Sequence, residues 1–195
     1  MNQDGQPDPR RDVWENPLAS RYASPEMTRL WSDRNRYRTW REVWLALAEA
    51  EAELGLAITP EQLAQLRAAL EPVDFARAAA YEKQMRHDVF AHLHTYADAA
   101  PAARPIIHLG ATSAFVTDNT DLMLMRESLD LVAARLAGVV EALADKAART
   151  RDVVCLGLTH LQPAQPTTIG KRICLWIHDL LVDLEEVLHR RHLLR

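Results

Sequence analysis

Three short segments of the sequence combine residue types that bind anions or transfer protons; they are Arg86–His94, His108–Asp121 and Gly157–Arg172. The first begins with Arg-His-Asp, which places a permanent cation, a titratable ring and a carboxylate side by side and suits an anionic ligand. A metal site is not favoured, because its three histidines are five and two residues apart, whereas ligands on one helix face are spaced by three or four. We expect His92 and His94 to lie on a helix surface without a chemical role.

The second segment surrounds Gly110 with small and hydroxyl-bearing residues, just before a long helical stretch. Backbone N–H groups at a helix N-terminus, together with the hydroxyls of Thr112 and Ser113, form a cradle for a carboxylate or a phosphate. An ordinary helix start, capped by Thr117 or Asp118, explains the same residues without any ligand. Both interpretations remain open on this segment alone.

The third segment holds a histidine, two glutamines, three threonines and two prolines within sixteen residues. A plain connection between two antiparallel helices needs only about 2–8 residues. Loops that carry polar groups on a rigid scaffold are a usual setting for catalysis, and His160 can donate or accept a proton near neutral pH. The composition therefore favours a functional loop over a simple connection.

Helical signals flank all three segments. We expect helices from about Ser32 to Leu54, from a capping box that pairs Thr59 with Gln62, and from Phe75 to about Ala99. Glycine is scarce, with six in 195 residues against a usual share of about 7%, and strand-like alternation of useful length is absent from the sequence. These features predict an all-α fold.

Two apolar seams follow, with residues spaced alternately by three and four positions. They consist of Leu122, Met125, Leu129, Val132, Leu136, Val139 and Leu143, and of Ile173, Ile177, Leu180, Leu184 and Val187. The first seam predicts a helix of about 38 residues, roughly 57 Å long. Helices of this length cannot bury their apolar stripes alone, so we expect the chain both to oligomerise and to be part of a longer protein.

The overall composition excludes several classes of protein. A formal net charge of −4 argues against a nucleic-acid binder and against a polybasic membrane anchor. No apolar stretch approaches the roughly 20 residues of a membrane span, and the N-terminus does not resemble a secretory signal. The two cysteines are too few for a disulfide framework, so a reduced, cytoplasmic compartment is expected. Prolines crowd the N-terminus, and we expect residues 1–15 to be a disordered tail.

Taken together, four motifs resemble a known family of enzymes. They are SRYASPEM at 20–27, RHDVFAH at 86–92, HLGATSAFVTDNTDL at 108–122 and GLTHLQPAQPTTIGKR at 157–172. In this order they resemble the adenylosuccinate lyases of the fumarase/aspartase superfamily. The fourth motif alone also fits fumarase-like and argininosuccinate-lyase-like enzymes, whereas the Arg21-Tyr22 pair and the Arg-His-Asp run favour the purine enzyme.

The resemblance implies an all-α protein, with an N-terminal helical domain over 16–111 and the first long helices of a central bundle over 112–195. It implies a β-elimination in purine biosynthesis that needs no cofactor and no metal. Fumarate leaves, giving AMP from adenylosuccinate or the aminoimidazole-carboxamide ribotide from its succinyl precursor. By motif position, His160 matches the general acid and His87 lies close to the reaction centre. The implied substrate-binding residues are Arg21, Tyr22, Arg86, His87, Asp88, Thr112, Ser113 and Thr159.

The resemblance also implies a homotetramer whose active sites are each assembled from three subunits. A further signature of the family, a serine-containing loop that carries the base, is not found in this sequence. The sequence therefore resembles the N-terminal portion of such an enzyme, and we expect it to be inactive alone. Two alternatives remain: a non-catalytic helical assembly or nucleotide-binding module derived from such a lyase, and another lyase of the superfamily.

Overall fold

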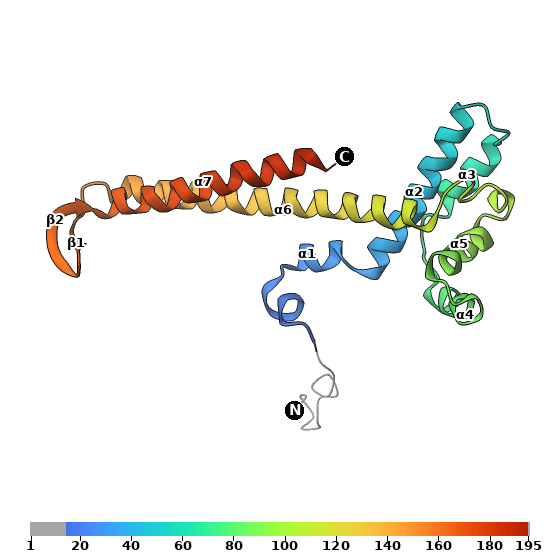
Figure 1. The fold of residues 1–195 in the computed structure, drawn as a ribbon, viewed down its shortest axis with the longest axis horizontal. Helices are drawn as coiled ribbons and strands as arrows, with labels where there is room; N and C mark the ends of the chain where they lie inside the picture. Colours follow the sequence, from blue (N-terminus) through green and yellow to red (C-terminus); the bar gives the residue numbers. More distant parts are fainter. Residues whose placement is uncertain (1–14, 195) are drawn as a thin grey trace, which may run out of the picture. The chain divides into compact units, whose positions relative to one another are not determined.

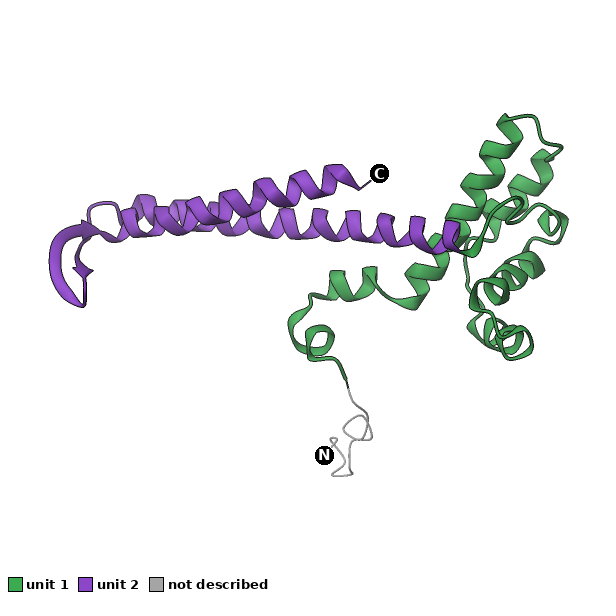
Figure 2. Cartoon of the chain, in the orientation of Figure 1, with its two compact units in different colours: residues 1–113 green, residues 114–195 purple. Residues whose placement is uncertain are grey.

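Helices dominate the part of the chain that the computed structural model describes, residues 15–194, and the all-α prediction is confirmed (Figure 1). The chain divides into two compact units, residues 1–113 and 114–195 (Figure 2). The tail predicted over residues 1–15 lies outside the described residues except for Glu15. None of the helices within residues 15–194 is both long and apolar enough to cross a membrane.

Over residues 15–113, the first unit is built from seven helices. They are η2 (Leu18–Tyr22), α1 (Pro25–Leu30), α2 (Asp33–Glu53), α3 (Pro60–Ala68), α4 (Phe75–Met85), α5 (Asp88–Ala99) and η3 (Pro101–Ala103). Capping residues in the sequence mark the starts of α1, α2, α3 and α4. The predicted capping box is present, because Thr59 and Gln62 each accept a hydrogen bond from the other's backbone N–H. The helix predicted from about Ser32 to Leu54 is confirmed as α2, with Ser32 as its N-cap.

A buried cation organises the core of this unit. Arg41 of α2 is only 2% exposed. Its guanidinium donates to three carbonyl oxygens at 2.6, 3.4 and 3.0 Å, those of Ala69, Leu70 and Pro72. It also lies 5.0 Å from the ring centroid of Tyr96 in α5, whose hydroxyl donates to a carbonyl of α3. These contacts replace the water contacts that the guanidinium loses on burial, and they hold α2, α3 and α5 against one another.

The single helix predicted over residues 75–99 is wrong, because α4 and α5 are separate helices that pack side by side. Arg86 adopts a left-handed conformation with φ of 53°, and His87 is extended, so the chain changes direction there. A left-handed conformation costs a residue with a side chain about 1–2 kcal/mol. Neither glycine nor proline marks the break, which is why the sequence pattern did not reveal it.

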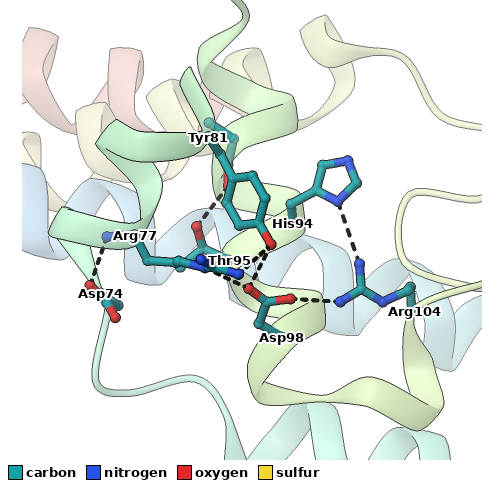
Figure 3. Close-up of polar contacts among 8 residues, drawn as sticks. Asp74, Arg77, Tyr81, His94, Thr95, Asp98 and Arg104 are labelled. Carbon is teal, nitrogen blue, oxygen red and sulfur yellow. Dashed lines mark hydrogen bonds and ion pairs between the residues drawn. The ribbon is translucent and has the colours of Figure 1, made fainter. Parts of the chain in front are cut away.

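A polar network joins α4 to α5 and stabilises this break (Figure 3). The carboxylate of Asp98 accepts a hydrogen bond from the Tyr81 hydroxyl at 2.8 Å and one from Arg77 at 3.0 Å. Arg104 donates to the second oxygen of Asp98 at 2.6 Å and lies 3.5 Å from the His94 ring. Burial alone would raise the pKa of Asp98, but these hydrogen bonds lower it below its usual value. His94 is thus a half-buried neighbour of this network.

The surface position expected for His92 is also wrong, since its ring is only 6% exposed. The ring stacks on Tyr37 with a centroid separation of 3.6 Å and meets Trp40 edge to face at 5.5 Å. Burial, reinforced by the charge of Arg41, lowers the pKa of His92 to about 4. His92 is therefore a neutral part of the core at neutral pH.

The second unit consists of two long helices joined by a β-hairpin. Its elements are α6 (Ser113–Arg149), β1 (Val154–Thr159), β2 (Gln162–Thr168) and α7 (Ile169–Leu193). The 37 residues of α6 confirm the predicted long helix, and α7 runs back beside it (Figure 1). Arg191 of α7 donates to both carboxylate oxygens of Asp130 in α6, at 2.7 and 3.1 Å. Much of the first seam stays open, because Met125, Val132 and Val139 are all exposed.

The β-hairpin was not predicted. Its strands pair antiparallel, from Val154 opposite Thr168 to Thr159 opposite Gln162. Most side chains of both strands are exposed, and burial alternates only over the first four residues of β1. The partly buried residues there are Cys155 and Gly157, which form no apolar stripe that would identify a half-buried strand. Two prolines in β2 weaken the signal further, and they are tolerated because this strand has a free edge.

The core position of His92 predicts a pH-dependent stability. Its pKa is about 4 in the folded chain and has its ordinary value of 6.5 in the unfolded chain, so between these values only the unfolded chain binds the proton. The free energy of unfolding should therefore fall by about 3 kcal/mol between neutral pH and pH 4. Urea unfolding at both pH values measures the decrease, which His92→Phe should reduce and the exposed-site control His178→Phe should not. An equal decrease in His92→Phe would contradict this prediction.

Gly170 predicts a second, local effect on stability. A Cβ atom at this position would meet the Ala147 carbonyl of α6, and it would lie 2.8 Å from the Cα atom of Arg151, just after that helix. Gly170→Ala should therefore destabilise the junction of α7 with α6 by about 1–3 kcal/mol. Gly138 is the matched control, since it lies exposed inside α6 with nothing within 4 Å of an added Cβ, and Gly138→Ala should stabilise by about 0.5–1 kcal/mol. Urea unfolding of both variants tests the expected opposite signs.

Candidate functional site

The Arg-His-Asp run occupies the break between α4 and α5 and is exposed. His87 is the N-cap of α5, and Asp88 is its first residue. The Asp88 carboxylate accepts a hydrogen bond from the Val89 N–H at 2.8 Å and lies 3.4 Å from Nδ1 of His87. The helix break therefore presents an imidazole at a helix N-terminus, where the backbone N–H groups favour an anion.

The second segment brings a hydroxyl to this imidazole. The Oγ atom of Ser113 lies 3.4 Å from Nε2 of His87, although 26 residues separate them in the sequence. Ser113 is the first residue of α6, so Thr117 and Asp118 lie inside the helix and do not cap its start. Of the two interpretations left open from the sequence, the helix start capped by Thr117 or Asp118 is therefore wrong. Thr112 precedes Ser113 and is exposed beside the same helix N-terminus.

His108 completes this group, and its role was not predicted from the sequence. Its Nδ1 atom lies 2.9 Å from Nε1 of the buried Trp44, which donates a hydrogen bond to it. Phe90 lies 5.0 Å from the ring of His87 and 6.0 Å from that of His108, centroid to centroid. Burial, and then the charge of His87, lower the pKa of His108 below its ordinary value. We call His87, Phe90, His108 and Ser113 the histidine cluster.

His160 belongs to the second unit, where it occupies the tip of the β-hairpin. His160 and Leu161 form its two-residue turn, and both have positive φ, 51° and 62°. Paired positive φ values are those of a type I′ turn, which favours Asn and Gly, so both residues hold a strained conformation. Leu161 is 97% exposed, and both His160 and its neighbour Thr159 are exposed as well.

A pocket of about 540 Å³ opens beside this hairpin, within the second unit. Thr159 and Gln165 line it from the strands, and Lys171 and Arg172 line it from the first turn of α7. The Thr168 hydroxyl caps that helix by accepting from the N–H of Lys171 at 3.2 Å. Two cations at a helix N-terminus suit an anionic ligand, and a polar strand edge beside them can orient it.

The remaining candidates, Arg21 and Tyr22, lie on η2 and are exposed. The guanidinium of Arg21 lies 5.6 Å from the ring centroid of Tyr22, which makes them a cation–π pair. The structure thus brings His87, Asp88 and Ser113 together in one place and holds Arg21 and Tyr22 as a separate pair. Within residues 15–194, no three His, Cys, Asp or Glu side chains are grouped so that they could hold a metal ion.

Comparisons with known proteins agree with the four motifs. Residues 20–194 match the protein family described as "Lyase". Adenylosuccinate lyase of Schistosoma mansoni is 49% identical over 176 residues, which are 90% of this chain and 37% of that protein. Adenylosuccinate lyase of Saccharomyces cerevisiae is 51% identical over 179 residues, again 90% of this chain and 37% of that protein. The chain therefore spans less than two fifths of the length of these relatives.

Solved structures with a similar fold include two enzymes. The fumarate lyase from Mesorhizobium sp. BNC1 is similar with a TM-score of 0.77 and 27% identity, over 86% of this chain and 40% of that one. The 3-carboxy-cis,cis-muconate lactonizing enzyme from Pseudomonas putida is similar with a TM-score of 0.76 and 26% identity, over 89% of this chain and 41% of that one. Sequence identity is thus higher to the two adenylosuccinate lyases than to these enzymes.

The electrostatic contact between the two histidines of the cluster predicts a measurable coupling. The charge of His87 contributes to the lowered pKa of His108, so His87→Gln should raise the pKa of His108 towards its ordinary value of 6.5. A pH titration of the histidine ring signals by NMR measures both groups. His94→Gln, which removes a ring outside the cluster, is the control and should leave the pKa of His108 unchanged. An unchanged His108 titration in His87→Gln would contradict the coupling.

Proposed function

Because the chain belongs to the lyase family, we propose that it forms the N-terminal portion of a C–N lyase of purine biosynthesis. Its substrates are adenylosuccinate, which yields AMP and fumarate, and the succinyl precursor of the aminoimidazole-carboxamide ribotide. The identity of about half of the aligned residues to two adenylosuccinate lyases supports this choice over other lyases of the superfamily. The observation that carries the proposal is the approach of His87 to Ser113 at the start of α6, which joins two of the four motifs.

The reaction is a β-elimination, and its requirements agree with the residues present. A base removes a proton from the β-carbon of the succinyl group, next to the carbon that carries the leaving nitrogen, and the electrons of that C–H bond form the double bond of fumarate between these two carbons. The C–N bond breaks with its electron pair on nitrogen, which then takes up a proton. We assign that protonation to His160, and no cofactor is needed because both proton transfers are within reach of side-chain acids and bases. Thr159, next to it, contacts the substrate.

The substrate carries two carboxylates and a phosphate, and each needs cationic or N–H donors. Thr112 and Ser113, with the N-terminus of α6, bind a carboxylate in the proposed site. Arg86, His87 and Asp88 form a second substrate-binding group, in which His87 lies near the reacting atoms. A third group, the Arg21–Tyr22 pair, binds the phosphate and supplies it with a permanent cation.

The proposed enzyme is a cytoplasmic homotetramer whose active sites combine residues of three subunits. The exposed apolar side chains of α6 and α7 support this assembly, because long helices with open stripes gain stability by packing against further helices. The base that removes the carbon-bound proton is assigned to a serine-containing loop of the enzyme, for which these 195 residues contain no recognisable motif.

The isolated 195-residue chain should form no fumarate from adenylosuccinate. The groups of a catalytic unit act together, so a unit without its base loses most of its rate. Absorbance at the fumarate band measures the reaction, with His160→Ala as the blank. Turnover by the unsubstituted chain above that blank would contradict the inactive-fragment proposal.

The role of His160 is tested in a chimera, in which this chain replaces the matching region of the Saccharomyces cerevisiae enzyme. The chimera should form fumarate, and His160→Ala should reduce kcat by about 10²–10⁴-fold, the usual contribution of a general acid. His178→Ala, at an exposed position of α7, is the matched control and should retain activity. A fully active His160→Ala chimera would remove His160 from the mechanism, and a folded but inactive chimera would favour the non-catalytic module.

A further inference from the structure

We infer that Trp44 is a positioning residue, which holds the proton of the His108 ring on Nε2 so that this ring donates a hydrogen bond to a dicarboxylate bound at the histidine cluster. The class of ligand, a dicarboxylate, rests on the proposed function. The position of the proton on the His108 ring does not, because it depends only on contacts within the first unit.

The hydrogen bond between the two rings determines where the proton lies. The indole N–H of Trp44 can only donate, and it lies 2.9 Å from Nδ1 of His108. A ring nitrogen that accepts a hydrogen bond carries no proton, so a neutral His108 has its proton on Nε2. Protonation of Nδ1 would place two N–H groups against each other, so the bond also opposes the charged form of His108.

The donor cannot turn away from His108, because its surroundings are closed. Trp44 is fully buried, stacks on Tyr96 at a centroid separation of 6.1 Å and meets Trp40 edge to face at 6.3 Å. Tyr96 is itself held by its contact with Arg41. The indole is therefore a rigid part of the core that reaches the cluster with a single polar group.

The backbone of His108 supports a role beyond packing. Its φ of 69° is left-handed, a conformation that costs a residue with a side chain about 1–2 kcal/mol. The hydrogen bond from Trp44 offsets this cost and orients the ring beside Phe90 and the charge of His87. The cluster thus combines the exposed imidazole of His87 with a second imidazole, that of His108, which is held as an N–H donor.

The two buried tryptophans of α2 provide a matched pair of variants. Trp44→Phe removes the indole N–H that His108 accepts. Trp40→Phe is the same change on the same helix, but within the described residues the Nε1 atom of Trp40 is buried without a hydrogen-bond partner. A comparable loss of packing is therefore expected from both, and only the first removes the hydrogen bond.

The proton position is read from the ¹⁵N chemical shifts of the histidine rings in the 195-residue chain. We expect the Nε2–H form of His108 in the unsubstituted chain and in Trp40→Phe, and a mixture of both forms with a raised pKa in Trp44→Phe. Finding the proton on Nδ1 in the unsubstituted chain, or no change in Trp44→Phe, would overturn the inference.

Binding of fumarate to the same chain, followed by NMR titration, tests whether His108 donates a hydrogen bond to the ligand. Trp44→Phe should weaken binding at least threefold relative to Trp40→Phe. His108→Asn provides a second variant, because its carbonyl oxygen can accept from Trp44 and asparagine tolerates positive φ, but it has no donor at the place of Nε2. It should fold and weaken binding at least threefold.

Two results of the binding experiment would contradict the donor role of His108. Unchanged binding in Trp44→Phe and His108→Asn, or no fumarate binding by the unsubstituted chain, would overturn the donor role. The lyase proposal is judged separately, by fumarate formation in the chimera, so the two can fail independently.

Discussion

The burial of the Arg41 guanidinium is the constraint on which the rest of the first unit depends. A desolvated cation is costly unless every donor finds a partner, and its partners here are carbonyls of the segment that follows α3, together with the ring of Tyr96. Tyr96 in turn packs against Trp44, and Trp44 holds His108 by its indole N–H. One charge in the core is therefore linked, through two aromatic rings, to the position of a ring in the candidate site.

The second unit has no comparable buried centre, because its long helices have few packing partners within this chain. The α6 and α7 pair buries only part of each stripe. At Gly170 the start of α7 lies so close to the backbone at the end of α6 that a Cβ atom does not fit. The exposed hairpin beyond that junction carries His160 and Thr159. In the proposed enzyme, assembly of these helices with other copies stabilises the bundle and also brings the hairpin into a complete site, so oligomerisation and catalysis have the same structural cause.

The sequence was most informative where local chemistry decides the structure. The Thr59–Gln62 box and the 37 residues of α6 follow from capping groups and apolar spacing, which act over a few residues. The break at Arg86 and the burial of His92 depend on contacts between helices far apart in the sequence, and no local signal marks them. Recognition of motifs supplied the candidate residues, whereas the contact between His108 and Trp44, 64 residues apart, required the fold.

Backbone conformation distinguishes His108 and His160, in the candidate segments, from His92, which is part of the core. Among the described residues, the non-glycine positions with positive φ are Arg86, His108, His160 and Leu161, and all of them lie in the three segments first selected for their chemistry. His92, in contrast, lies within the regular helix α5 and is neutralised by burial. Strain of this kind persists only where the surrounding structure imposes it, and it is concentrated at functional sites. The left-handed residues therefore identify the same segments as the polar motifs, from an independent property of the chain. They also single out His108, which lies in the second motif but was not among the candidate site residues.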